Sequence, residues 1–256
     1  MIPKVIHYCW FGRGEKSKLI QKCMKSWKKY CPDYEIIEWN EDNFDINSNE
    51  FVRQAYECKK WAFVSDYVRL FVLYNYGGVY LDTDQELLSS LESFMGYEGF
   101  MGFLDDKNIS AGIIGCKAKL SVVKEFLNYY SQASFSTTPN TNIMTKIMIE
   151  NGLKMNDERQ RVAEFEIFPQ TVFCPTSCVS YKKKHSKQTV AVHHWAMTWR
   201  KPTEIKKFKK AKRHKAWWYY KNLMILPQKT VRLILGDDRV EKIKSKILNK
   251  GIADKK

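Results

Sequence analysis

The sequence predicts an α/β fold with a mostly parallel central sheet, followed by a basic helical tail. A chain of 256 residues, 44% of them hydrophobic, can bury one full core. Strand-like and helix-like segments alternate along its first two thirds, as in a sheet covered by helices. Positive charge gathers at the end: residues 182–256 hold 23 Lys and Arg against 5 Asp and Glu. We therefore expect a catalytic-size domain over residues 1–205 and an extension over residues 206–256.

A strand, a helix and a second strand are predicted at the N-terminus. Ile2–Tyr8 has the composition of a buried strand. Lys16–Tyr30 places apolar residues at helical spacing, and Pro32 ends that helix. Tyr34–Trp39 has the alternation of a second strand. Segments of these lengths in this order predict a βαβ unit with a parallel pair of strands.

A long apolar helix and a short strand are predicted next. The run WAFVSDYVRLFVLYNY follows Lys59 without a helix breaker and meets Gly77-Gly78, where glycine can adopt positive φ and end the helix. Val79–Asp82 then has the pattern of a short strand.

The remaining predicted elements are two helices, two strands and a basic helix in the tail. They cover Lys117–Ser131, Thr141–Glu150, Glu164–Phe168, Thr189–His194 and Val231–Leu248. The segment Asn108–Gly115 fits either an ordinary strand with a turn or a loop on the acceptor side of a site.

Cysteine usage and hydropathy indicate the cellular compartment of the protein. The seven cysteines form no paired C-x-x-C spacing, so we expect reduced and mostly buried thiols. No signal-peptide pattern and no run of 18 apolar residues is present. We expect a cytoplasmic protein that meets a membrane from that side.

Asp82 and Asp84 are the candidate ligands of a divalent cation. They follow a predicted strand directly, and ligands of α/β proteins gather at the carboxyl ends of strands. Carboxylate oxygens together with substrate phosphates suit Mg²⁺ and Mn²⁺. Read alone, the D-x-D spacing also fits an ordinary surface turn.

Asp66 and Arg69 place opposite charges on one face of the long apolar helix. Unpaired charges are costly in such surroundings, so the two side chains need partners. One interpretation is an internal ion pair that stabilises the helix. The other is a functional pair, with the aspartate on sugar hydroxyls and the arginine on a diphosphate.

Three segments carry a resemblance to a known family. IPKVIHYCWFG, WAFVSDYVRLFVLYNYGGVYLDTD and AVHHWAMTW occur in this order over roughly residues 1–200. They resemble the bacterial capsular-polysaccharide and lipopolysaccharide sugar transferases with a DXD sugar-binding region. These belong to glycosyltransferase family 32, with the Och1-like mannosyltransferases and α1,4-galactosyltransferases, and are distant relatives of the clostridial glucosylating toxins.

The resemblance implies a GT-A (Rossmann-like) fold and a cation-dependent reaction. It implies Mn²⁺ or Mg²⁺ and a nucleotide-sugar donor, with a UDP-sugar favoured over GDP-mannose, and transfer with retention of anomeric configuration. The expected acceptor is a hydroxyl of a glycan or a lipid-linked oligosaccharide in capsule, lipopolysaccharide or other surface polysaccharide synthesis, at the inner face of a bacterial cell membrane.

The resemblance also assigns residues to the donor. Trp10 matches the position that stacks on the nucleotide base, and Asp66 and Arg69 match the pair that contacts donor sugar and phosphates. Trp199 matches the tryptophan of a loop that closes over the donor. Thr198 stands where the family commonly has serine and keeps a hydroxyl. The alternative for both tryptophans is an ordinary place in the core.

The cation site is assigned to three residues. Asp84 matches a direct ligand, Asp82 matches a residue shared between cation, sugar and ribose, and His193 matches the histidine that completes the site. The alternative for His193 and His194 is an ordinary place in a strand.

The basic, aromatic tail has three open interpretations. An anionic membrane attracts Lys and Arg, and Trp and Tyr favour its interface. Nucleic acid would also bind basic and aromatic residues, but it leaves the D-x-D segment unexplained. A solvated basic face without a partner is the third. A phosphotransferase is disfavoured because the chain lacks the glycine loops G-x-x-x-x-G-K-[ST] and G-x-G-x-x-G.

Overall fold

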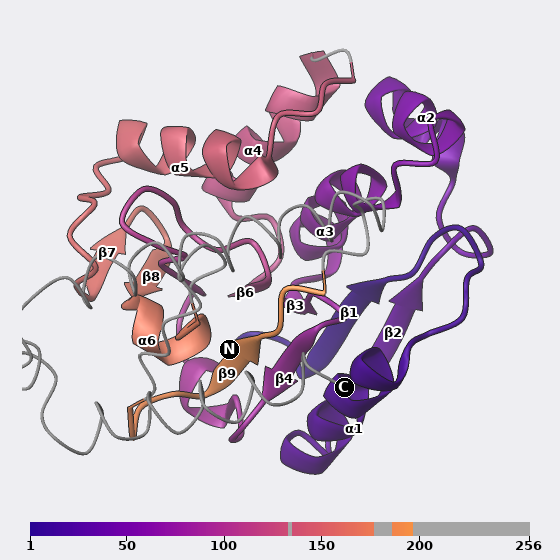
Figure 1. Cartoon of the computed structure of the whole chain (residues 1–256). Helices are drawn as coiled ribbons and strands as arrows, with labels where there is room; N and C mark the ends of the chain where they lie inside the picture. The colour runs from indigo at the N-terminus through magenta and orange to yellow at the C-terminus, as the bar shows by residue number, and fades with distance from the viewer. Residues whose placement is uncertain (133–134, 177–185, 197–256) are drawn as a thin grey trace, which may run out of the picture. The chain divides into compact units, whose positions relative to one another are not determined.

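The structure, a computed structural model, describes residues 1–132, 135–176 and 186–196 (Figure 1). Within these ranges the chain forms a seven-stranded sheet with helices on both faces, and a separate two-stranded sheet. The predicted boundary between residues 205 and 206, the basic helical tail and Trp199 lie outside the described residues.

Five of the seven strands in the main sheet point the same way, whereas β6 and β7 run antiparallel to their neighbours. Across the sheet, the strands follow the order β2 (Glu35–Trp39), β1 (Val5–Cys9), β3 (Gly78–Leu81), β6 (Ile113–Cys116), β5 (Gly99–Gly102), β8 (Phe165–Phe168) and β7 (Gln160–Val162). This order confirms the predicted α/β fold with a mostly parallel central sheet.

The predicted βαβ unit is confirmed at one edge of this sheet. Strands β1 and β2 are parallel, with Ile6 opposite Ile36, and β1 is also parallel to β3, with Ile6 opposite Val79. Helix α1 (Lys18–Tyr30) connects β1 to β2, and the Ser17 side chain accepts a hydrogen bond from the Ile20 N–H at its start. The carboxyl ends of β1, β2 and β3 therefore meet at the same edge.

Helices cover both faces of the sheet and form one hydrophobic core on each. Successive strand residues alternate between the two cores: Val79 and Leu81 belong to one, Tyr80 to the other. Helices α2 to α5 contribute to the core of Tyr80, and α1 and α6 to the opposite core. The bounds of these further helices are α2 (Glu50–Glu57), α3 (Trp61–Tyr76), α4 (Ser121–Gln132), α5 (Asn140–Glu150) and α6 (Gln170–Phe173); two 3₁₀ turns cover η1 (Ile46–Ser48) and η2 (Glu92–Phe94).

Gly77 ends helix α3, as predicted. It has φ of 67°, and its N–H donates a hydrogen bond to the Leu73 C=O at 3.0 Å. A Cβ atom at this position would lie 2.8 Å from the Ala118 nitrogen, so close packing also requires glycine. The sharp turn sends the chain directly into β3, which carries it toward Asp82.

A second sheet of two strands lies beside α1 (Figure 1). Strand β4 (Gln85–Leu87) pairs antiparallel with β9 (Ala191–His193), so segments far apart in the sequence become neighbours. The indole N–H of Trp27 on α1 donates a hydrogen bond to the Gln85 C=O at 2.7 Å, which attaches β4 to the helix.

The cysteines agree with a further prediction for the described part of the chain. Its six cysteines are all free, and all but Cys58 are buried. None of its helices combines the length and apolar character that crossing a bilayer requires.

Candidate functional site

Asp82 and Asp84 lie at the carboxyl edge of the main sheet, in the turn that leads from β3 into β4. The Asp82 N–H donates a hydrogen bond to the Gly112 C=O at 2.8 Å, which holds the turn against the segment before β6. The Asp82 side chain keeps 26% of its surface exposed, whereas the Asp84 side chain keeps 12%. The two carboxylates therefore occupy a partly enclosed position that a ligand can reach from the Asp82 side.

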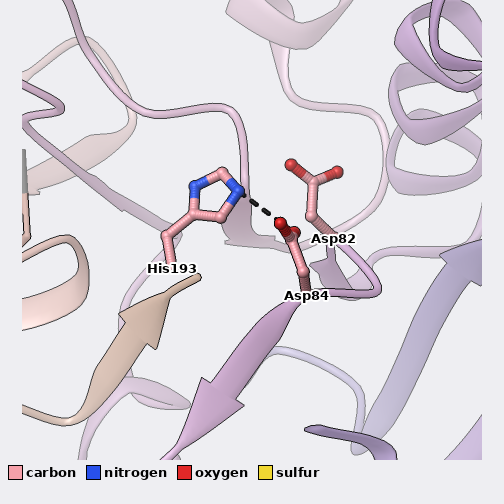
Figure 2. A group of neighbouring side chains, drawn as sticks. All are labelled: Asp82, Asp84 and His193. Atoms are coloured by element: carbon pink, nitrogen blue, oxygen red, sulfur yellow. Dashed lines mark ion pairs between the residues drawn. The ribbon is translucent and has the colours of Figure 1, made fainter. Parts of the chain in front are cut away.

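Strand β9 brings His193 to the same place (Figure 2). The Nε2 atom of His193 lies 3.1 Å from Asp84 Oδ1. The other oxygen, Asp84 Oδ2, accepts a hydrogen bond from the Ala196 N–H at 2.7 Å, and the His194 N–H donates to the Asp84 C=O at 3.1 Å. Asp84 is thus contacted by the His193 side chain and by two backbone N–H groups of the segment after β9.

The three side chains have the chemistry and spacing of a cation site. One ligand atom from each of Asp82, Asp84 and His193 lies within 4.8 Å of the others. His193 Nδ1 is buried and makes no hydrogen bond within the described residues, an unusual state for a polar atom. Two carboxylates and an imidazole suit Mn²⁺, and the carboxylates also suit Mg²⁺. The residues present therefore fit a divalent cation.

Asp84 and His193 form an ion pair. Burial alone would raise the pKa of Asp84, but the His193 charge and two backbone N–H groups outweigh it and lower the pKa to about 2. Burial alone would lower the pKa of His193, but Asp84 raises it well above its ordinary value, with a smaller contribution from the Cys174 thiol. The pair shows how strongly this position favours a positive charge beside the carboxylates.

Asp66 and Arg69 form a buried ion pair that extends to Asp82. Arg69 Nη2 lies 2.9 Å from Asp66 Oδ1 and 3.4 Å from Asp82 Oδ1. Its Nη1 donates to the Ala111 C=O at 2.7 Å, and its Nε donates to the Ser65 C=O at 3.2 Å. The internal ion pair that the sequence allowed is thus present, and it lies beside the candidate cation site. Contact of either side chain with a donor stays a prediction.

Burial affects the pKa values of Asp66 and Arg69 differently. Burial raises the pKa of Asp66 to about 7, although the Arg69 charge opposes this. Burial would lower the pKa of Arg69, but the Asp82 and Tyr80 side chains outweigh it and raise the pKa. Arg69 is therefore a permanent positive charge at the site.

Trp10 follows β1 at the same edge of the sheet. Its indole N–H donates a hydrogen bond to the Gly14 C=O at 2.7 Å, and Lys16 Nζ lies 5.2 Å from the ring centroid. The side chain is half-buried, so it is neither a fully enclosed core residue nor a free one. Its place beside the carboxyl ends of β1 and β3 is compatible with the predicted contact to a nucleotide base, which stays a prediction.

A comparison with protein families assigns the segment that contains both aspartates. Residues 17–101 match the family described as the glycosyltransferase sugar-binding region containing a DXD motif. This match assigns a DXD-type glycosyltransferase sugar-binding region to residues 17–101, a third of the chain. The match includes α1 and β2, helix α3 with Asp66 and Arg69, and the turn that holds Asp82 and Asp84, whereas β1 precedes it.

Proteins similar to this chain include enzymes named for mannosyl transfer. The chain is 30% identical over 122 residues to inositol phosphoceramide mannosyltransferase 3 of Schizosaccharomyces pombe, covering 44% of this chain and 33% of the relative. It is 28% identical over 127 residues to mannosyl phosphorylinositol ceramide synthase SUR1 of Saccharomyces cerevisiae, covering 45% and 31%. The chain thus spans about a third of the length of these relatives.

Two solved structures resemble the chain in outline. The PaToxG glycosyltransferase has a TM-score of 0.46 at 16% identity, covering 58% of this chain and 68% of that one. A glycosyltransferase involved in glycosylation of the major capsid of PBCV-1 has a TM-score of 0.45 at 13% identity, covering 77% and 95%.

Three residues of the site had no role in the sequence-based prediction. The Tyr80 hydroxyl donates to Asp82 Oδ1 at 3.1 Å, and its ring lies under Arg69, 4.7 Å from the guanidinium carbon. The Trp195 ring stacks on His193 with centroids 4.1 Å apart. Tyr80 and Trp195 lie inside the recognised segments and could have been found there, whereas Gly112 contacts the site only through tertiary packing.

Proposed function

We propose that this chain is a metal-dependent, retaining glycosyltransferase that moves a hexose from a nucleotide-sugar donor to a hydroxyl group of a glycan or lipid-linked acceptor. The observation that carries the proposal is the meeting of Asp82, Asp84 and His193 within 4.8 Å at the carboxyl edge of the sheet. Two of these residues lie inside the matched sugar-binding region, and the third comes from the distant strand β9.

Asp82, Asp84 and His193 would hold Mn²⁺ or Mg²⁺ beside the donor diphosphate. A bound cation supplies positive charge that offsets the negative charge growing on the leaving diphosphate. Arg69 adds a second positive charge from within the protein, because its guanidinium is held 3.4 Å from Asp82. Both charges favour the transition state over the bound donor, since the negative charge increases as the glycosidic bond breaks.

Further residues would bind and enclose the donor. Asp66 would accept hydrogen bonds from sugar hydroxyls, and Trp10 would stack on the base. Trp199, in a closing loop, would exclude water and so limit hydrolysis of the donor. In a retaining transfer the leaving phosphate can accept the proton of the acceptor hydroxyl, so we assign no base to Asp105 or Asp106.

The donor sugar is the next part of the proposal. Relatives named for mannosyl transfer favour a mannose donor, which makes GDP-mannose a candidate beside the UDP-sugars. A screen of UDP- and GDP-sugars for Mn²⁺-dependent hydrolysis would test enzyme class and donor together. We expect hydrolysis of one donor, dependent on added Mn²⁺ and abolished by a chelator.

Asp84→Ala tests the cation site directly. We expect this variant to fold but to lose Mn²⁺-dependent donor turnover, because it removes a buried ligand. Asp33→Ala is a matched control, since Asp33 is an exposed aspartate paired with Lys4 before β2, away from the candidate site. Full activity of Asp84→Ala, or equal loss in both variants, would refute the proposed role of Asp84.

The acceptor is proposed to be presented at a membrane. Relatives named for inositol phosphoceramide act on a lipid, and the tail over residues 206–256 is basic and aromatic. We propose that this tail contacts an anionic membrane near a lipid-linked acceptor in surface polysaccharide synthesis. Flotation with anionic vesicles, compared for the full chain and a chain lacking residues 206–256, tests the contact. Equal flotation of the two chains would exclude this role for the tail.

A further inference from the structure

Gly112 lies between two of the proposed cation ligands. A Cβ atom built at this position would be 3.1 Å from Asp82 Oδ2 and 3.3 Å from both Cε1 and Nδ1 of His193. Ordinary van der Waals contacts of a Cβ atom begin near 3.4 Å. A Cβ atom at position 112 would therefore require Asp82 and His193 to shift by a few tenths of an ångström.

The backbone around Gly112 is fixed from both sides. The Gly112 C=O accepts the Asp82 N–H at 2.8 Å, and the preceding Ala111 C=O accepts Arg69 Nη1 at 2.7 Å. Strand β6 begins at the next residue, Ile113, which pairs with Leu81 of β3. Because these contacts hold the segment in place, a side chain at position 112 would displace Asp82 and His193 rather than move away from them.

We infer that Gly112 is a positioning residue that sets the spacing between Asp82 and His193, and with it the width of the cation site. This inference rests on the proposed function, because it assumes that these side chains bind a divalent cation. Ligand distances in metal sites lie within about 0.2 Å of their ordinary values. The displacement that a Cβ atom demands, a few tenths of an ångström, is therefore large enough to weaken binding.

The test compares Mn²⁺ binding by the wild-type chain, Gly112→Ala and Gly96→Ala, measured by calorimetric titration. Gly96 is a matched control because a Cβ atom there meets nothing within 4 Å. We expect Gly112→Ala to bind Mn²⁺ about 10-fold more weakly, in the range found for residues that orient metal ligands. Gly96→Ala should bind as the wild type does.

The outcomes separate this inference from the proposed function. Equal Mn²⁺ affinity of the wild type and Gly112→Ala would overturn the positioning role and leave the cation site standing. A wild-type chain that binds no Mn²⁺ would overturn the cation site itself, and the role of Gly112 with it.

A second measurement needs no metal and covers a variant that folds poorly. If the Cβ atom acts by pressing on the Asp82 carboxylate, removing that carboxylate should relieve the contact. We expect Gly112→Ala to lower the unfolding midpoint less in an Asp82→Ala background than in the wild type. Equal shifts in the two backgrounds would show that position 112 does not act on Asp82.

Discussion

His193 Nε2 approaches Asp84 Oδ1 to 3.1 Å across the β4–β9 pair. The contact depends on the pairing of these strands, because Gln85, the residue after Asp84, lies opposite His193. Two backbone N–H groups, from His194 and Ala196, add hydrogen bonds to Asp84. The positions of Asp84 and His193 in the candidate cation site therefore depend on the pairing of β9 with β4.

The neighbouring residue His194 should supply part of that attachment. Its Nε2 lies 2.6 Å from Glu86 Oε2, on the strand that β9 pairs with. We expect His194→Ala to destabilise the protein by about 1 kcal/mol, because it removes a partly buried hydrogen bond to a carboxylate. We also expect weaker Mn²⁺ binding, although His194 is not a proposed ligand. Chemical denaturation and calorimetric titration measure the two effects, and Mn²⁺ affinity equal to wild type would contradict the second.

Trp27 should be required for the position of β4. It is fully buried on α1, and its indole N–H donates to the Gln85 C=O at 2.7 Å. We expect Trp27→Ala to lower the free energy of unfolding by about 3–5 kcal/mol, because it leaves a large cavity. Trp27→Phe keeps most of the ring but removes the hydrogen bond, so it should lower the free energy of unfolding by less than Trp27→Ala does. Urea denaturation of the two variants checks the order, and equal losses would be inconsistent with a cavity effect.

Arg69 should be needed for folding even without substrate. Arg69→Met leaves Asp66 and Asp82 without their shared partner in a buried position, which costs about 3–5 kcal/mol for comparable ion pairs. Adding Asp66→Asn to this variant should recover part of the loss, because it removes one unpaired charge. Arg53→Ala is the control, since Arg53 pairs only with exposed glutamates. Denaturation measures the free energy of unfolding of each variant. A decrease for Arg69→Met as small as that for Arg53→Ala would exclude a structural role for Arg69.

His7 should make the stability of the protein depend on pH. The Trp39 indole N–H donates to His7 Nδ1 at 3.1 Å, so the Nε2–H must donate to the Gly77 C=O at 2.9 Å. A proton on Nδ1 would face the Trp39 N–H. Burial lowers the pKa of His7 below its ordinary value, opposed only in part by the bond to Gly77.

The sign of the His7 effect follows from this lowered pKa. Below about pH 6.5 the unfolded chain binds a proton that the folded chain refuses, so stability falls as pH drops through that region. The slope contributed by one group is at most about 1.4 kcal/mol per pH unit. We expect a shallower decline between pH 7 and 5 in His7→Gln, measured by denaturation at each pH. Parallel curves for variant and wild type would rule out His7 as the cause.

Much of the fold was predictable from local patterns. The helical spacing between residues 16 and 30, the strands on either side of it and the apolar helix ended by Gly77 are all present. Each depends on periodicity or on a turn residue within a short stretch of chain. Helices α2 and α6 and the short strands β4, β5 and β7 had no prediction. Strands of three or four residues carry too few positions to show a period.

The sequence by itself determined the residue types and local positions on which the prediction of a donor site depends: two aspartates after a strand, an aspartate and arginine on one helical face, and a distant histidine. Only the tertiary structure decided that His193 meets Asp84, that Arg69 is shared between Asp66 and Asp82, and that Gly112 lies close to both Asp82 and His193. Side-chain type and local conformation are encoded over a few neighbouring residues. Distances between β4, β9 and the segment before β6 depend instead on how the whole core packs.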